Sequence, residues 1–289
     1  MKKEKLTLKD TFAIALKNYK EKKFLIAENL CNKILSIDPD HFDSLVLLSN
    51  MYAIKKDFKK AKELMIKADK IKPNNLSVLN NLGTACKELG DNKSAVSYYE
   101  KIIKINPNHT NAQYNLGVMF YNLKEYKKAK NFFQKTTEIQ PNYALAFISL
   151  ANVFFELKEY TKAIKNYQKA IEINPNIVGA HNNLGLVFRV LNDYENAIKC
   201  YEQAIKINKN NAGAYHNLAL AQKEIGKFTE AVISHEQAIK LEPNNLTHYF
   251  YLSELKKDIV NDNLKDKIKN IIEDKNSTKQ NIAYGNYLL

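Results

Sequence analysis

The sequence predicts an all-α fold in which antiparallel pairs of helices stack into a solenoid. The first observation is a period, because the six prolines are separated by 34, 34, 34, 34 and 68 residues. The second is that every 34-residue copy carries two amphipathic helical patterns. The third is that the twentieth place of every copy is alanine. The prolines are Pro39, Pro73, Pro107, Pro141, Pro175 and Pro243, and the alanines are Ala27, Ala61, Ala95, Ala129, Ala163, Ala197 and Ala231.

Seven full copies of this repeat follow an expected N-terminal tail, residues 1–7. The seventh place of a copy is Ile or Leu, and the eighth is always Ala, Ser or Gly. Self-similarity of this kind decides the architecture before any single residue does. The copies span residues 8–41, 42–75, 76–109, 110–143, 144–177, 178–211 and 212–245.

The third copy illustrates the two helices of a repeat. Leu82 and Cys86 lie at helical spacing in its first half, and Ala95 and Tyr99 do so in its second half. The eighth place of this copy is Gly83. We expect such a small residue to let the two helix backbones approach closely, while the ring of Tyr99 fills the space beside it.

Turn chemistry predicts where the helices end. Gly90, Asn192 and Gly226 lie in short linkers, where the C-terminus of a first helix needs a positive φ. Proline ends the second helices, because it lacks an N–H and its ring displaces the carbonyl four residues back. The sixth copy has Lys209 where proline is expected. We therefore expect its second helix to run on slightly, with unchanged packing.

A single hairpin of this length is not expected to be stable alone. Ordering 34 residues costs on the order of 50 kcal/mol, at about 1.5 kcal/mol per residue. One hairpin cannot bury enough apolar surface to offset that cost. Stacking on neighbouring copies supplies the missing burial, as in a solenoid.

The pattern changes after residue 245. Tyr249 keeps the register of one more first helix, but the twentieth place is Lys265 instead of alanine. The stretch 264–274 is still amphipathic and is suited to closing the last apolar face. We expect a half repeat plus a capping helix over residues 246–274. Residues 275–289 are expected to be a tail that begins a further segment, because the chain ends on apolar residues.

Three short motifs connect this repeat with a known family. They are "YNLGVMF" at Tyr114–Phe120, "EYKKA" at Glu125–Ala129 and "AIEINP" at Ala170–Pro175. Over about residues 8–245 the chain resembles the tetratricopeptide repeat family. The resemblance implies a right-handed α-α superhelix whose first helices line a concave surface. The segment that follows resembles the stretch that joins such repeats to sulfotransferase domains in some bacterial proteins.

Composition narrows the classes of function. The net charge is +13, but of the 44 basic residues only Arg189 is arginine, the usual reader of phosphates and base edges. Specific nucleic-acid binding is therefore not expected, although salt-dependent RNA binding remains an alternative. No apolar run is long enough for a membrane span, and no export signal is present, so a cytoplasmic location is expected.

No catalytic, metal or cofactor motif stands out. The three cysteines are far apart and form no Cys/His pair, and no phosphate-binding or metalloprotease motif occurs. We expect no catalytic residue, no metal ligand and no cofactor. His235 stands where Tyr99 and Tyr201 stand in other copies, which favours a packed core imidazole over a ligand.

The candidate binding residues lie on the first helices. Place six is asparagine in four copies, and we call these residues the asparagine row. A side-chain amide carries a donor and an acceptor, so it can pair with both polar groups of a peptide unit. The row resembles the asparagine ladder in the repeat arm of O-GlcNAc transferase. The row is Asn81, Asn115, Asn183 and Asn217, and Asn50, Asn152, Tyr114, Tyr121 and Phe155 add to the same face. Asn182, which precedes a row residue, and Arg189, which can contact acidic side chains, complete the expected groove.

These observations favour a noncatalytic scaffold that binds an extended peptide segment of a protein partner in a concave groove. Two alternatives stay open. The asparagines can instead have no binding role, since asparagine is common at this place in the family that the chain resembles and the chain is rich in asparagine. The chain can also be the substrate-recognition arm of a larger bacterial sulfotransferase or glycosyltransferase whose catalytic domain lies outside it.

Overall fold

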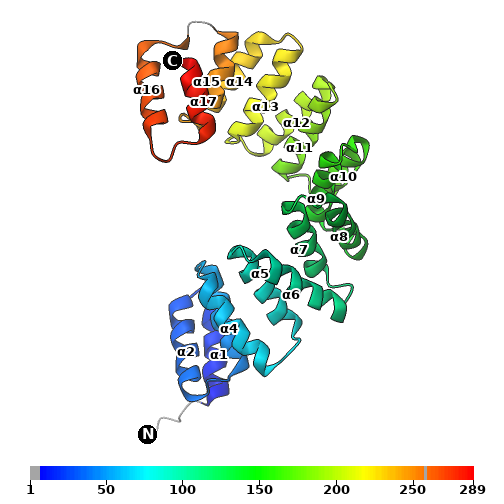
Figure 1. The fold of residues 1–289 in the computed structure, drawn as a ribbon, viewed down its shortest axis with the longest axis vertical. Coiled ribbons are helices and arrows are strands. Elements are labelled where there is room, and N and C mark those ends of the chain that lie inside the picture. Colours follow the sequence, from blue (N-terminus) through cyan, green and yellow to red (C-terminus); the bar gives the residue numbers. More distant parts are fainter. Residues whose placement is uncertain (1–6, 257–258) are drawn as a thin grey trace. The chain divides into compact units, whose positions relative to one another are not determined.

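The computed structural model describes residues 7–256 and 259–289, which form seventeen helices and no strand (Figure 1). The described residues divide between two compact units, and the second unit begins at Asn142. The first unit contains α1 (Leu8–Lys20), α2 (Phe24–Ile37), α3 (Phe42–Ile54), α4 (Phe58–Ile71), α5 (Leu76–Glu88), α6 (Asn92–Ile105), α7 (Thr110–Asn122) and α8 (Tyr126–Ile139). The second contains α9 (Ala144–Glu156), α10 (Tyr160–Ile173), α11 (Val178–Val190), α12 (Tyr194–Ile207), α13 (Ala212–Glu224), α14 (Phe228–Leu241), α15 (Leu246–Leu255), α16 (Asp262–Glu273) and α17 (Lys279–Leu288).

Within each unit the helices pack in chain order. α1 pairs with α2 and α2 packs on α3, and this pattern continues to α8 in the first unit and from α9 to α15 in the second. The all-α prediction of stacked helix pairs is therefore confirmed. Residues 1–6 of the expected N-terminal tail lie outside the described residues. Thr7 caps α1, because its Oγ1 accepts a hydrogen bond from the N–H of Asp10 at 3.1 Å.

The repeated alanines and glycines lie at the helix crossings. Every alanine at place twenty is at most 2% exposed, as expected for residues between stacked helices. Gly117 lies directly against the ring of Phe133, since a Cβ on this glycine would come within 2.6 Å of Cε1 of that ring. Gly83 and Gly185 meet tyrosine rings in the same way. The predicted close approach at place eight is confirmed.

The linkers between first and second helices share one backbone conformation. Gly90 and Gly226 have φ values of +77° and +78°, and Asn192 has a φ of +59°, as predicted. Lysine occupies the same place in the other four copies and also takes a positive φ, which is unfavourable for a residue with a Cβ. These lysines are Lys22, Lys56, Lys124 and Lys158.

The predicted overrun at Lys209 is wrong. α12 ends at Ile207 after 14 residues, just as α10 ends at Ile173 after 14 residues before a proline. The reason is Asn208, which is extended with φ −135° and accepts a hydrogen bond at Oδ1 from the N–H of Asn210 at 3.0 Å. An asparagine that bonds the backbone two residues ahead favours a turn over a helix. The helix therefore stops without a proline.

Restoring the missing proline is expected to stabilise the protein. Lys209→Pro should raise the free energy of unfolding by about 0.4–1 kcal/mol, because it restricts the unfolded chain. Asn208 already has the extended conformation that a residue before proline requires. Urea denaturation measures the change, and Lys206→Pro inside α12 is the control, expected to cost about 3 kcal/mol. A Lys209→Pro protein no more stable than the parent would contradict this account.

The C-terminal helices cover the end of the second unit. α17 packs on α15 and α16, with Ile268 and Leu288 buried in a shared apolar cluster with Leu246. The expected tail, residues 275–289, thus contains a packed helix. Gly285 makes this possible, because a Cβ there would lie 2.4 Å from Cγ2 of Ile272.

Candidate functional site

All the predicted binding residues lie on first helices, and all are half-buried. The first unit holds five of them on α3, α5 and α7, and the second holds six on α9, α11 and α13. Those of the first unit are Asn50, Asn81, Tyr114, Asn115 and Tyr121, and those of the second are Asn152, Phe155, Asn182, Asn183, Arg189 and Asn217.

The asparagines are paired between neighbouring first helices. In the first unit, the Nδ2 of Asn81 donates to the Oδ1 of Asn50 at 3.0 Å. In the second unit, Asn183 donates to Asn152 at 3.2 Å, and Asn217 donates to Asn182 at 3.1 Å. The sequence alone did not indicate these bonds. They link one repeat to the next, so the asparagines have a structural role.

The pairing leaves part of each row amide unused. Asn81, Asn183 and Asn217 each use one N–H in their pair. Within the described part of the chain, the Oδ1 atoms of these three residues accept no hydrogen bond. Each therefore keeps one donor and one acceptor, which is the set that a peptide unit requires. Asn115 makes no side-chain bond with another described residue.

The aromatic residues of the predicted face pack within their own repeats. The ring centroid of Tyr114 lies 5.6 Å from that of Phe133, the core residue of α8. The ring centroid of Tyr121 lies 5.5 Å from that of Tyr126 at the start of α8. The ring centroid of Phe155 lies 5.8 Å from that of Tyr160 at the start of α10. These rings are thus partly occupied in holding each pair of helices together.

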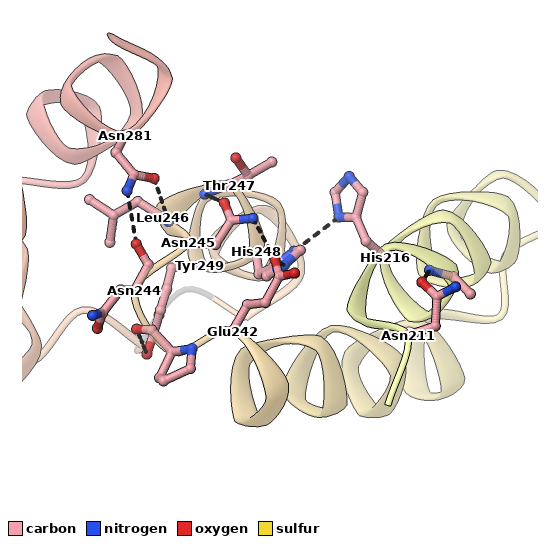
Figure 2. Close-up of polar contacts among 12 residues, drawn as sticks. Asn211, His216, Glu242, Asn244, Asn245, Leu246, Thr247, His248, Tyr249 and Asn281 are labelled. Carbon is pink, nitrogen blue, oxygen red and sulfur yellow. Dashed lines mark hydrogen bonds and ion pairs between the residues drawn. The ribbon is translucent and has the colours of Figure 1, made fainter. Parts of the chain in front are cut away.

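Three histidines meet at the end of the second unit, which the sequence did not indicate. His235 is fully buried, so the prediction of a core imidazole is confirmed. His216 lies beside it, with ring centroids 5.4 Å apart. The Nδ1 atoms of His216 and His248 are 3.4 Å apart, and the Nε2 of His248 lies 3.2 Å from a carboxylate oxygen of Glu242 (Figure 2).

Burial keeps these imidazoles neutral. It lowers the pKa of His216 to about 4 and the pKa of His235 to about 3, and the neighbouring positive charges act in the same direction. Burial also lowers the pKa of His248, although its bond with Glu242 opposes this effect. Among the described residues, no group of three or more His, Cys, Asp or Glu side chains is arranged to hold a metal ion.

Two clefts of about 390 and 460 Å³ lie near the C-terminal helices, and Asn281 lines both. Its amide is already engaged: Oδ1 accepts from the N–H of Leu246 at 3.0 Å, and Nδ2 donates to the carbonyl of Asn244 at 2.9 Å (Figure 2). Asn281 thereby joins α17 to the start of α15. None of the predicted binding residues lines these clefts. Within residues 7–256 and 259–289, every helix is too short or too polar to span a bilayer.

Comparison with family models gives repeat matches through most of the chain. Models described as a TPR repeat match residues 151–189 and 187–226. Models described as a tetratricopeptide repeat match residues 75–142, 42–75 and 212–245. The matched ranges end at residue 245, so the resemblance of the next segment to sulfotransferase-linked arms stays a prediction. No curated protein sequence matches the chain.

Several solved structures share the fold. A crystal structure of MamA is 28% identical with a TM-score of 0.54, over 56% of this chain and 95% of that one. PilF of Pseudomonas aeruginosa is 19% identical with a TM-score of 0.65, over 74% of this chain and 97% of that one. YrrB, described as a TPR protein with an unusual peptide-binding site, is 19% identical with a TM-score of 0.55, over 65% and 97%.

Proposed function

The chain belongs to the tetratricopeptide repeat family, and from this premise we propose that it is a noncatalytic scaffold that binds an extended peptide segment of a protein partner. In each unit such a segment lies along the first helices and is held by the members of the asparagine row in that unit. The peptide-binding site named for YrrB is consistent with a peptide as the partner.

The proposal rests mainly on the hydrogen-bonding groups that the row amides do not use in their pairs. Each of Asn81, Asn183 and Asn217 keeps one N–H and one oxygen for an outside partner. The bond inside each pair also restricts the orientation of the amide. A side chain held in place before binding loses less conformational entropy when the partner arrives.

The spacing of the first helices suits an extended chain. α11 contacts both α9 and α13. Packed helices lie about 8–10 Å apart, and an extended segment advances about 3.3 Å per residue. About three residues of peptide thus separate one row amide from the next. Because the row amides contact the backbone of the peptide, any preference for particular peptide side chains comes from other residues of the groove.

Asn115→Ala tests the proposal most directly, because Asn115 makes no inter-asparagine bond that its loss would break. The purified full chain is applied to an array of random, end-capped peptides of fixed length. Loss of two hydrogen bonds to the peptide backbone, at about 0.5–1.5 kcal/mol each, should weaken binding about 5- to 100-fold. The unfolding midpoint should stay unchanged.

Asn131→Ala is the matched control, because Asn131 is exposed on the second helix α8. It should bind the array like the parent protein. Asn183→Ala and Asn217→Ala should lower both binding and stability, since each also loses a bond between repeats. Unaltered peptide binding in all three row variants would refute the proposal.

A further inference from the structure

Place twelve of the first helices is basic in three copies, but the three residues differ in their partners. Lys87 lies 3.0 Å from a carboxylate oxygen of Glu88, and Lys223 lies 2.7 Å from one of Glu254. Within the described part of the chain, Arg189 takes part in no ion pair. Arg189, the only arginine of the sequence, is thus the member of this set that has no carboxylate partner among the described residues.

Arg189 lies among tyrosine and histidine side chains of the second unit. It is half-buried on α11, and its Nε atom is buried without a hydrogen-bond partner. The hydroxyl of Tyr201 lies close to Arg189: burial raises its pKa to about 12, against the charge of Arg189 and a weak hydrogen bond with that side chain. The charge of Arg189 also acts on His216, which burial already keeps neutral, and on Tyr251.

Such a guanidinium favours an anionic ligand. Because no carboxylate of the described residues pairs with the guanidinium, its terminal N–H groups can donate to an incoming anionic acceptor. A carboxylate fits best, because its two oxygens match the planar fork of an arginine side chain. In a half-buried position the charge is less screened by water than on an open surface.

We propose that Arg189 binds the side-chain carboxylate of an aspartate or glutamate in the peptide held by the second unit. This inference rests on the proposed function and adds an acidic residue to the partner. Arg189 lies six residues after Asn183 on α11, about 9 Å farther along the helix and about a third of a turn around its axis. Asparagine pairs lead from α11 to both α9 and α13, so the segment runs past Arg189 instead of ending there. The carboxylate therefore belongs to a side chain and not to a C-terminus.

The test uses the purified full chain and an array of N-acetylated, C-amidated peptides. The peptides form pairs that differ by Glu against Gln at one position. We expect the Glu member to bind at least about tenfold more tightly at one fixed position. Arg189→Gln should abolish this preference and keep the binding of the Gln peptides, and Arg189→Lys should retain part of it.

Lys87→Gln and Lys223→Gln are the matched controls, and both should keep the preference for Glu. Peptide binding without any preference for Glu over Gln in the parent protein would overturn the inference and leave the proposed function standing. A preference that appears only in peptides with a free C-terminus would overturn the assignment to a side chain. Absence of binding to every peptide would overturn both proposals. Because the Glu and Gln comparison is made first on the parent protein, the test stands even if an Arg189 variant folds poorly.

Discussion

Gly117→Ala is expected to destabilise the first unit by about 1–3 kcal/mol. Alanine is normally the better helix former by about 1 kcal/mol, so the expected sign is opposite to the intrinsic preference. The cause is steric: the added Cβ would lie 2.6 Å from Cε1 of Phe133, a side chain that is itself only 1% exposed. The ring can move only by opening the contact between α7 and α8.

A matched glycine separates this effect from helix propensity. Gly179 lies in α11, and a Cβ there would have no atom within 4 Å. Gly179→Ala should therefore leave stability unchanged or raise it by up to about 1 kcal/mol. Urea denaturation of the two variants measures the difference. If Gly117→Ala were as stable as the parent, the close approach would not matter energetically.

A second substitution shows whether the ring is the cause. The second copy has Ser49 at place eight, and the core residue at place twenty-four is Met65 instead of an aromatic. Methionine is flexible and fills irregular spaces. Phe133→Met should therefore recover part of the stability lost in Gly117→Ala, with a coupling free energy of about 0.5–3 kcal/mol between neighbours.

The order and ends of the helices were predictable because the signals are local and repeated. Place twenty is alanine and place eight is small in every copy, so these signals support one another along the chain. Asn208 also indicated the end of α12 in the sequence. The absence of proline at the next position nevertheless led to the wrong prediction of a longer helix. The signal for α17 was Thr278, which caps that helix by accepting from the N–H of Asn281 at 3.1 Å.

The polar contacts of the candidate site were not predictable in the same way. Asn183 and Asn152 are 31 residues apart, while Asn217 and Asn182 are 35 apart. Both spacings are close to the period, so they place the residues on neighbouring first helices. Which amide donates to which oxygen depends on the side-chain rotamers at the crossing, and no pattern in one sequence determines these. The contact between His216 and His248 likewise depends on side-chain rotamers that the sequence pattern does not determine.

The three histidines should make the second unit sensitive to mild acid. Their pKa values are lowered in the folded protein, chiefly by burial, whereas an unfolded chain has histidine pKa values near 6.5. The stabilising contribution is therefore complete above about pH 6.5. It is lost as the pH falls toward about 4 for His216 and about 3 for His235, because unfolding then takes up protons. His235 alone should cost about 2–3 kcal/mol by pH 4.5.

His235→Phe isolates this contribution. Aromatic residues occupy the same place in other copies, and the fifth copy combines an alanine at place eight with Tyr167 at place twenty-four, so we expect a ring to fit against Ala219. Urea midpoints of the variant and the parent are compared from pH 7.5 to 4.5. The variant should gain relative stability as the pH falls. The facing charges are Lys223 and Arg189, which disfavour protonation of His235 and His216 respectively, and Glu242, which favours that of His248. The carboxylates are the same in both proteins and titrate mainly below pH 4.5. Parallel curves of urea midpoint against pH would therefore show that the buried imidazole does not control the acid response.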